Sequence, residues 1–223
     1  MRRKITADLF KRLERLYTGL VCDVLDDQLG FGNNRYMMSY EIRALRWGAI
    51  VAGRAATALA APVHREPADP YAKEIQFIDT LSPGDVVVMT QSGAFQAGLW
   101  GGLLSTRAQK RGACGAVIDG ITRDTREIIR MGFPTFIRGI APGDSKGRVE
   151  VIEIHVPIQC AGASVNPGDV VFGDHDGVVV IPQEIAVDIV RLAEEKQAKE
   201  KKFQSELKRG VSLSKLFKKY GIL

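Results

Sequence analysis

The sequence predicts a mixed α/β fold, and two features of the chain support this expectation. Apolar segments of strand length alternate with segments of helical length between residues 49 and 131, which is the pattern of an α/β core. Turns that contain Gly and Pro separate these segments, and the chain has 23 glycines and 9 prolines. A length of 223 residues allows one sizeable core. We therefore expect a single α/β domain, residues 1–190, followed by a charged C-terminal helical arm, residues 191–223.

The segments follow a regular order along the chain. Leucine and valine at helical spacing predict a helical opening over residues 6–29, with a break before Thr18, which can cap the second part. The motif Pro83-Gly-Asp-Val-Val recurs at Pro167 with different flanks, which indicates repeated turn chemistry before a strand and not a duplicated domain. Residues 30–45 are expected to form a loop. Further strands are expected over 49–60, 86–90, 113–119, 134–137, 148–157 and 178–182, and further helices over 71–81, 103–111 and 124–131.

The basic charge of the chain is concentrated at its C-terminal end. The formal net charge is +5, but residues 191–223 hold ten Lys and Arg against four Glu, which leaves residues 1–190 at −1. This distribution indicates a solvated helical face. It argues against a nucleic-acid partner, because no aromatic interleaving supports stacking on bases.

Cysteine usage and hydropathy indicate a cytoplasmic protein without a membrane span. The three cysteines are widely spaced and form no C-x-x-C pair, which fits a reducing compartment. Cys114 lies in an apolar stretch, so we expect a buried residue inside a strand. The basic start of the chain, residues 1–4, is not followed by the apolar region of a signal peptide, and no apolar run is long enough to cross a membrane.

The C-terminal segment carries an apolar stripe that fades in its middle, through Lys196 and Glu200. A helix that loses its apolar face usually leaves its own domain and packs on another surface, and a neighbouring subunit is the natural candidate. The stripe consists of Ile185, Ile189 and Leu192 before the gap, and of Phe203 and Leu207 after it.

The most informative stretch is residues 112–124, an apolar strand that ends at Asp119-Gly120 and is followed by Arg123-Asp124 at the start of a helix. An α/β protein can hold charged groups in a cleft where a strand end faces a helix N-terminus. Asp124 offers hard oxygen atoms suited to Mg²⁺ or Mn²⁺, and Arg123 offers a planar fork to a carboxylate or an enolate. The alternative is structural, because Asp124 followed by Glu127 is also a helix-capping signature.

Two other segments are candidates for binding a charged group. The Gly-rich loop over residues 92–102 lets the backbone approach a ligand, and the helix after it presents free N–H groups, but a plain tight turn is the alternative. It is not a P-loop, because no Gly-Lys-Ser/Thr follows. The cluster Asp174-His175-Asp176 is a competing metal candidate, for which a surface turn before a strand is the alternative.

The run from Gly101 to Asp124, which ends in Asp-Gly-x-x-Arg-Asp, closely resembles the family that contains 4-hydroxy-4-methyl-2-oxoglutarate aldolase and the regulator of ribonuclease activity A. Residues 18–26, 78–87 and 174–182 and the Tyr220-Gly ending are also similar to the family, in its order. The resemblance implies an α/β/β/α sandwich of the swivelling phosphohistidine-domain type. It also implies a homotrimer, or a hexamer of two trimers, with sites at the subunit boundaries.

The resemblance further implies a role for each candidate residue. In the aldolase branch, Asp124 holds a divalent metal through a largely water-filled shell, and Arg123 stabilises the pyruvate enolate. A glutamate from a neighbour's C-terminal helix holds metal-bound water, with Glu200 as the first choice and Glu195 as the second. The backbone amides that hold the substrate carboxylate are those of Gly101, Gly102, Leu103 and Leu104.

One departure from the family pattern concerns the water network. Some members carry an Asp where this chain has Gly102, and that acid helps to hold metal-bound water.

The expected function is a metal-dependent pyruvate aldolase of class II type that cleaves 4-hydroxy-2-oxo diacids such as 4-hydroxy-4-methyl-2-oxoglutarate, with oxaloacetate decarboxylation as a side activity. The alternative is a non-catalytic regulator that binds a ribonuclease assembly. The retained Arg123-Asp124 pair favours the enzyme.

Overall fold

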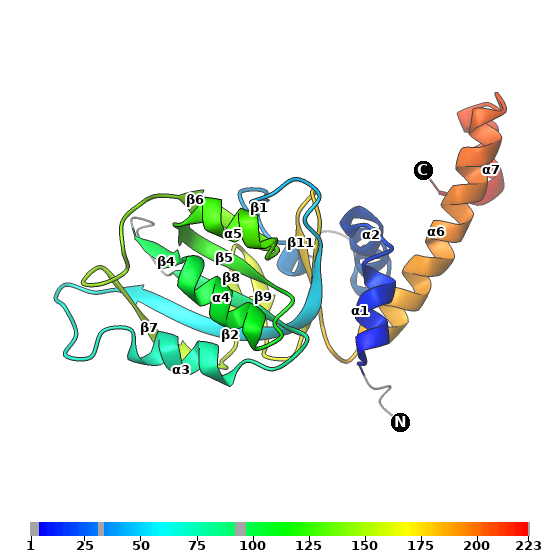
Figure 1. Cartoon of the computed structure of the whole chain (residues 1–223). Helices are drawn as coiled ribbons and strands as arrows, with labels where there is room; N and C mark the ends of the chain where they lie inside the picture. The colour runs from blue at the N-terminus through cyan, green and yellow to red at the C-terminus, as the bar shows by residue number, and fades with distance from the viewer. Residues whose placement is uncertain (1–4, 31–33, 92–96, 223) are drawn as a thin grey trace.

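The computed structural model describes residues 5–30, 34–91 and 97–222, and it confirms a mixed α/β fold (Figure 1). In these residues, nine strands form one curled sheet and two more form a hairpin. The helices are α1 (Ala7–Leu13), α2 (Thr18–Leu29), the 3₁₀ helix η1 (Asn34–Tyr36), α3 (Ala72–Thr80), α4 (Gly102–Lys110), α5 (Thr125–Met131), α6 (Ala186–Lys208) and α7 (Leu213–Tyr220). The strands are β1 (Arg43–Ala44), β2 (Val51–Pro62), β3 (Asp85–Gln91), β4 (Gly98–Trp100), β5 (Gly115–Thr122), β6 (Thr135–Ile140), β7 (Val149–Ile154), β8 (Ile158–Cys160), β9 (Ala163–Val165), β10 (Val170–Gly173) and β11 (Val178–Ile181).

The centre of the sheet is parallel, in the order β6-β5-β3-β2. β10 pairs with β2 antiparallel, β11 pairs antiparallel with β10, and β7 pairs with the far end of β2. β1 pairs antiparallel with β6, and the short strand β4 pairs in parallel with β5. Nearly every residue of β3 and β5 is buried, as expected of parallel strands that are covered on both faces.

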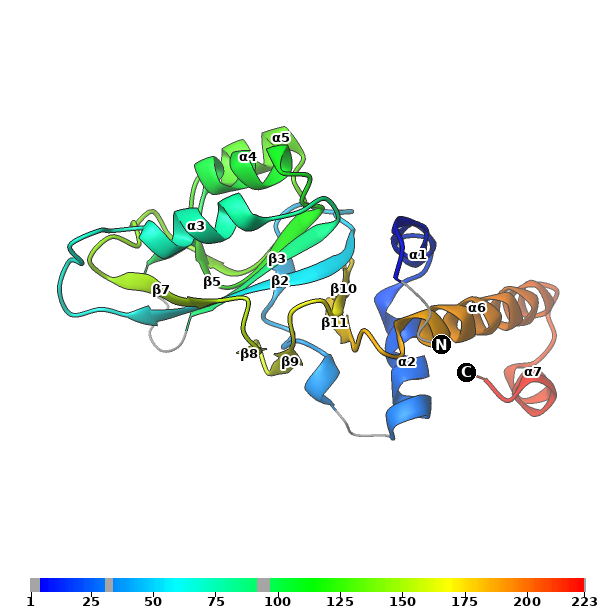
Figure 2. The same cartoon turned by 90° about the horizontal axis from the view of Figure 1, so that it is seen from below.

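Helices cover one face of this sheet and one end of it. α3, α4 and α5 lie side by side over one face (Figure 2), where their apolar side chains join those of β2, β3 and β5. On the opposite face, the β8–β9 hairpin packs on the sheet. α1, α2 and the first half of α6 form a further apolar cluster against β10 and β11. Because both faces are covered, the strands can be the continuous apolar runs that the sequence shows.

The two Pro-Gly-Asp turns lead into β3 and β10, the two neighbours of β2. In each turn, the Asp carboxylate accepts the backbone N–H of the residue three positions earlier. Asp85 accepts from Ser82 at 2.7 Å, and Asp169 accepts from Asn166 at 2.8 Å. The repeat is therefore turn chemistry, as predicted.

The break in the helical opening is confirmed, but the prediction that Thr18 caps the second helix is wrong. Thr18 is the first residue of α2, and its N–H and hydroxyl donate to the Asp174 carboxylate at 2.8 and 2.7 Å. Asp174 also accepts the N–H of Asp176 at 2.9 Å. The turn alternative for the Asp174-His175-Asp176 cluster therefore holds, because the carboxylate is occupied in joining β10 to α2. Within the described ranges, no group of three His, Cys, Asp or Glu residues is arranged to hold a metal ion.

Two predictions about residues 112–124 are also wrong. The strand does not end in a turn at Asp119-Gly120, because β5 continues to Thr122 and Asp119 lies inside it, 6% exposed. Its carboxylate accepts hydrogen bonds from Arg138 at 2.5 Å and from the Ala161 N–H at 2.6 Å. Cys114 is not inside the strand; it precedes β5 and is half-buried.

The C-terminal helix starts in the body of the protein and then leaves it. Arg12 of α1 forms a bidentate ion pair with Glu194 of α6, with N–O distances of 2.8 and 2.6 Å. Farther along, α6 extends away from the other helices, and α7 folds back on its end, where Phe203 contacts Tyr220 (Figure 1). In the part of the chain that the structure describes, no helix is long and apolar enough to cross a membrane.

The contact between β5 and the turn before β6 generates a first prediction. A Cβ atom at Gly115 would lie 2.6 Å from the Pro134 carbonyl oxygen and 2.7 Å from a Val51 methyl group. Gly115→Ala should therefore lower the free energy of unfolding by about 1–3 kcal/mol, measured by urea denaturation. Gly19→Ala in α2 is the control, because the nearest atom to its Cβ would be 3.8 Å away. The free energy of unfolding of the control should stay unchanged or rise by up to about 1 kcal/mol. Equal losses in both variants would mean that the close contact at Gly115 does not limit the side chain there.

Candidate active site

The candidate site forms where β4 and β5 end side by side. Because the two strands are parallel, their carboxyl ends meet at the same edge of the sheet. The Arg123 N–H donates to the Trp100 carbonyl at 2.9 Å, which continues the pairing past the end of β5. The pairing therefore places Gly101, just before α4, beside Asp124, just before α5.

Asp124 adopts a left-handed backbone conformation, with φ of 55°, and makes no side-chain hydrogen bond to its own helix. Its Oδ2 instead accepts the N–H of Gly102, the first residue of α4, at 3.1 Å. The capping alternative is therefore wrong: the Asp124 side chain does not cap α5, and it accepts its hydrogen bond from the first residue of α4. A Cβ atom at Gly101 would lie 2.9 Å from Asp124 Oδ2, so this close approach requires glycine.

The free part of the Asp124 carboxylate fits a hard divalent cation. Oδ1 makes no hydrogen bond with any residue that the structure describes, and the side chain is 45% exposed. A single carboxylate leaves most of a coordination shell to water and to ligand oxygens, which suits Mg²⁺ or Mn²⁺ better than zinc. A Cβ atom at Gly102 would lie 3.4 Å from the Asp124 Cβ, so an acid at this position would stand beside Asp124.

The start of α4 supplies hydrogen-bond donors at the same edge. The first N–H groups of a helix have no acceptor within the helix, and the helix dipole favours an anion there. Gly102 uses its N–H for Asp124, so the donors left for a ligand are those of Leu103 and Leu104. The predicted carboxylate-binding loop and the Arg123-Asp124 pair therefore lie together, as expected. Residues 92–96 of the predicted Gly-rich loop lie outside the described residues.

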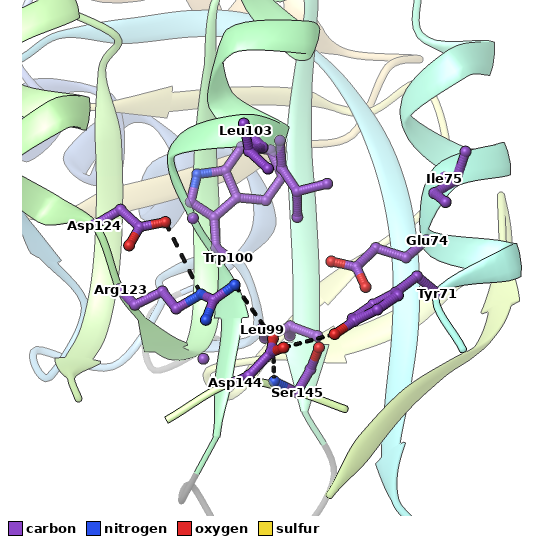
Figure 3. Close-up of a pocket in the computed structure, with 13 residues that line it drawn as sticks. Tyr71, Glu74, Ile75, Leu99, Trp100, Leu103, Arg123, Asp124, Asp144 and Ser145 are labelled. Carbon is purple, nitrogen blue, oxygen red and sulfur yellow. Dashed lines mark hydrogen bonds and ion pairs between the residues drawn. The ribbon is translucent and has the colours of Figure 1, made fainter. Parts of the chain in front are cut away.

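A cavity of about 350 Å³ opens in front of this edge (Figure 3). One part of its wall is apolar and comes mainly from β4, α3 and the start of α4. The other part carries charged and polar side chains from three separate segments. The apolar side chains are Ile75, Leu99, Trp100, Leu103 and Leu104, and the polar ones are Tyr71, Glu74, Arg123, Asp124, Asp144 and Ser145.

Arg123 lies between two carboxylates. Its Nη2 is 3.4 Å from Asp144 Oδ1, and its Nε is 3.9 Å from Asp124 Oδ2. Asp144 also accepts the Tyr71 hydroxyl at 2.6 Å and the Ser145 N–H at 2.8 Å. Although burial works in the opposite direction, these bonds and the charge of Arg123 lower the pKa of Asp144. Asp144 is therefore a fixed anion that orients the guanidinium.

Glu74, in the first turn of α3, is the site residue that sequence reasoning missed. It is only 8% exposed, and its carboxyl group turns toward the cavity (Figure 3). Burial raises its pKa to about 7; the nearby Asp144 adds to this shift, and Arg123 opposes it. It makes no hydrogen bond with any described residue. An acid in the first turn of a helix is so ordinary that no signal in the sequence marks Glu74 as buried.

The two glutamates expected to complete the site do not reach it within one chain. Glu200 accepts a hydrogen bond from the Tyr17 hydroxyl, and Glu195 pairs with Arg191 at 2.7 Å. Both lie on α6, which is at the opposite end of the molecule from the starts of α4 and α5 (Figure 1). Only a second copy of the chain could bring α6 to this cavity.

The burial of Glu74 predicts a pH-dependent cost in stability. The folded-state pKa of about 7 lies above the ordinary value of 4.5, so the folded state binds the extra proton, and stability falls as the pH rises between these two values. Glu74→Gln removes this cost. Without metal, the variant should gain stability relative to the wild type between pH 5 and pH 8, by on the order of 3 kcal/mol in the free energy of unfolding. Asp79→Asn, an exposed position on the same helix, should show no such trend. If the difference in the free energy of unfolding between Glu74→Gln and the wild type stays constant with pH, the raised pKa of Glu74 is wrong.

Solved structures with the same fold include members of a known family. RraAS2 from Streptomyces coelicolor, described as an unusual member of the RNase ES inhibitor RraA protein family, has a TM-score of 0.78 at 28% identity, covering 89% of this chain and 96% of that one. An uncharacterized protein from Pseudomonas syringae has a TM-score of 0.85, also at 28% identity, covering 99% of this chain and 97% of that one.

Curated relatives match parts of the chain. A protein of Cupriavidus necator named "Putative 4-hydroxy-4-methyl-2-oxoglutarate aldolase" is 31% identical over 72% of this chain and 92% of its own length. A Halalkalibacterium halodurans protein of the same name is 38% identical, and an uncharacterized Methanocaldococcus jannaschii protein is 37% identical. These two matches cover 52% and 57% of this chain, and they span only 55% and 61% of the length of those relatives.

The family profile described as RraA-like, Aldolase/RraA, matches residues 21–180. The matched range contains β4, α4 and β5, together with the Arg123-Asp124 pair and the cavity in front of them. The match covers well over half of the sequence, so the chain belongs to the RraA-like family.

Proposed function

We propose that the chain is a divalent-metal-dependent pyruvate aldolase that cleaves 4-hydroxy-2-oxo acids to pyruvate and a second oxo compound. One observation carries this proposal: a carboxylate with a free oxygen, a guanidinium and free helix-start N–H groups converge on one cavity. The aldolase names of several relatives support it, and they suggest diacids such as 4-hydroxy-4-methyl-2-oxoglutarate as substrates.

Each group of the site has a role in this proposal. The N–H groups of Leu103 and Leu104 bind the substrate carboxylate, and Asp124 holds Mg²⁺ or Mn²⁺. The bound ion supplies Lewis-acid chemistry to the 2-oxo acid. Arg123, held in place by Asp144, balances the negative charge that develops on the pyruvate enolate, where electrostatic stabilisation acts most strongly. The same enolate would allow decarboxylation of oxaloacetate.

We also propose that the site is completed in a homotrimer or a hexamer. The mouth of the cavity is lined by exposed apolar side chains, with Leu103 85% exposed and Ile75 55% exposed, which suits a protein cover. α6 extends away from its own body, so it could bring Glu200 or Glu195 to a neighbour's Asp124. The finer description of the fold as an α/β/β/α sandwich of the swivelling phosphohistidine-domain type, with residues 191–223 as an arm, belongs to the same proposal.

A non-catalytic role in binding a ribonuclease assembly is the second candidate. The likeness to RraAS2, described as a member of an RNase inhibitor family, supports it. The Arg123-Asp124 arrangement favours the enzyme, because a protein-binding surface does not need a buried titratable carboxyl group and a fixed guanidinium on the wall of one cavity.

Metal removal separates the two candidates. With Mg²⁺ or Mn²⁺, the protein should release pyruvate from 4-hydroxy-4-methyl-2-oxoglutarate and from oxaloacetate, measured with coupled lactate dehydrogenase. EDTA should abolish the release, and added Mg²⁺ should restore it. If no pyruvate forms from either substrate with metal present, the enzyme proposal fails and the binding role gains support.

Removal of the guanidinium tests the proposed role of Arg123. Arg123→Ala should lower kcat for both substrates by about 100-fold or more, because the charge of the enolate loses its partner. Arg107→Ala, an exposed position on α4, is the matched control and should keep wild-type activity. The melting temperatures of both variants should stay near that of the wild type. An Arg123→Ala enzyme with full activity toward oxaloacetate would refute the role.

A further inference from the structure

We propose that Glu74 is the acid–base group of this site: its carboxylate takes the proton of the substrate C4 hydroxyl and then delivers a proton to C3 of the pyruvate enolate. This inference rests on the proposed aldolase function and assigns the proton transfers that the reaction needs. It adds a catalytic residue from α3, a segment that contributes neither Arg123 nor Asp124.

The position of Glu74 is the first support. Its side chain is more than nine-tenths buried, yet no described residue donates a hydrogen bond to it. Buried carboxyl groups are almost always satisfied by a partner. Here the carboxyl group turns into the 350 Å³ cavity, on the wall across from Asp124, and Arg123 lies between the two (Figure 3). A substrate that is bound at Asp124 and extends past Arg123 would present its C4 hydroxyl to this wall.

The other groups of the cavity are less suited to carry the proton. Asp144 is engaged by Tyr71, Ser145 and Arg123, and its lowered pKa keeps it an anion. Tyr71 donates to Asp144, and this bond together with burial raises its pKa to about 12, so it stays protonated near neutral pH. The Glu74 pKa of about 7 lies where a catalytic acid–base group works best.

The proposed steps balance without an oxidant or a further reactant. The proton of the C4 hydroxyl moves to a Glu74 carboxylate oxygen, and C4–O becomes a carbonyl as the C3–C4 bond breaks. The electron pair of that bond forms the C2–C3 enolate, whose charge Arg123 faces. The proton on Glu74 then moves to C3 and forms the methyl group of pyruvate, which returns Glu74 to the carboxylate.

Glu74→Gln keeps the shape of the side chain and removes its basicity, and two reactions of the same site separate a base from a structural residue. Both reactions end with protonation of the enolate at C3, but only aldol cleavage requires loss of a hydroxyl proton before the C–C bond can break. In decarboxylation Glu74 has taken up no such proton, and the proton for C3 comes from water. The variant should therefore lose aldol cleavage of 4-hydroxy-4-methyl-2-oxoglutarate by about 100-fold or more. It should keep Mg²⁺-dependent oxaloacetate decarboxylation within about threefold of the wild type. Asp79→Asn, on the exposed side of α3, should keep both activities.

The pH profile gives a second readout. The charged and titratable groups around Glu74 are Arg123, Asp144 and Tyr71 in the cavity, and Lys73, Lys146 and Glu150 in a smaller neighbouring pocket. Neither Asp144 nor Tyr71 changes charge between pH 5 and 8. In the wild type, kcat/KM for aldol cleavage should rise from pH 5 toward neutral pH as Glu74 loses its proton. The residual cleavage by Glu74→Gln should lack this rise.

Three results would overturn the inference. Equal losses of cleavage and decarboxylation in Glu74→Gln would mean that the residue only holds the cavity in shape. Unchanged cleavage would mean that another group carries the proton. If the wild type releases pyruvate from neither substrate, the proposed function fails and the role of Glu74 in it fails too, a result that the first two outcomes cannot mimic.

Discussion

The parallel pairing of β4 with the end of β5 is the constraint on which the candidate site depends. It brings the two strand-to-helix turns to the same edge of the sheet, so that Gly101 before α4 and Asp124 before α5 come within contact distance. Gly101 has no side chain, and Asp124 adopts a left-handed backbone conformation that turns its carboxylate toward the start of α4. A side chain at position 101 would force the Asp124 carboxylate to move away from the start of α4.

A line of alternating charges extends from this edge across the cavity. Asp124, Arg123 and Asp144 follow one another, and Tyr71 closes the line from the α3 side. Asp144 orients the guanidinium through an ion pair whose side chains are about one third exposed. Such an ion pair adds little to the stability of the fold, so its main effect is to position Arg123. Glu74 lies beside this line without a hydrogen bond to any residue that the structure describes, and the burial of its carboxylate is a cost to folding that protonation or a ligand can offset.

Most of the fold could be predicted from the sequence, because burial on both faces makes each strand a continuous apolar run and each turn carries its own Gly or Pro. The errors arose where a distant residue decides the local role. Thr18 resembles a cap, but Asp174 fulfils that function from 156 positions away. Asp119 resembles a turn residue, but its partners Arg138 and Ala161 hold it inside a strand.

The same limit applies to the site. Arg123, Asp124 and the start of α4 could be proposed as site residues because they belong to one contiguous stretch, for which the resemblance to the family favoured binding over capping. Glu74 and Asp144 could not, because they reach the cavity from segments that no local pattern connects to it. Glu200 is a third case, since one copy of the chain does not bring it to the cavity at all.

The charges of the cavity link the proposed cation to the protonation of Glu74. With Glu74 neutral, Arg123 balances only one of the two anions, Asp124 and Asp144, so the cavity has a formal charge of −1 without a cation. A divalent cation at Asp124 would bring the charge to +1, and the two carboxylates of a bound diacid would then bring it to −1. Because a positive charge favours the ionised form of a nearby carboxyl group, the cation would lower the pKa of Glu74, and the substrate would raise it again. Metal binding would thus favour the carboxylate form of Glu74, and substrate binding would raise the pKa of Glu74 again, so that it can accept a proton.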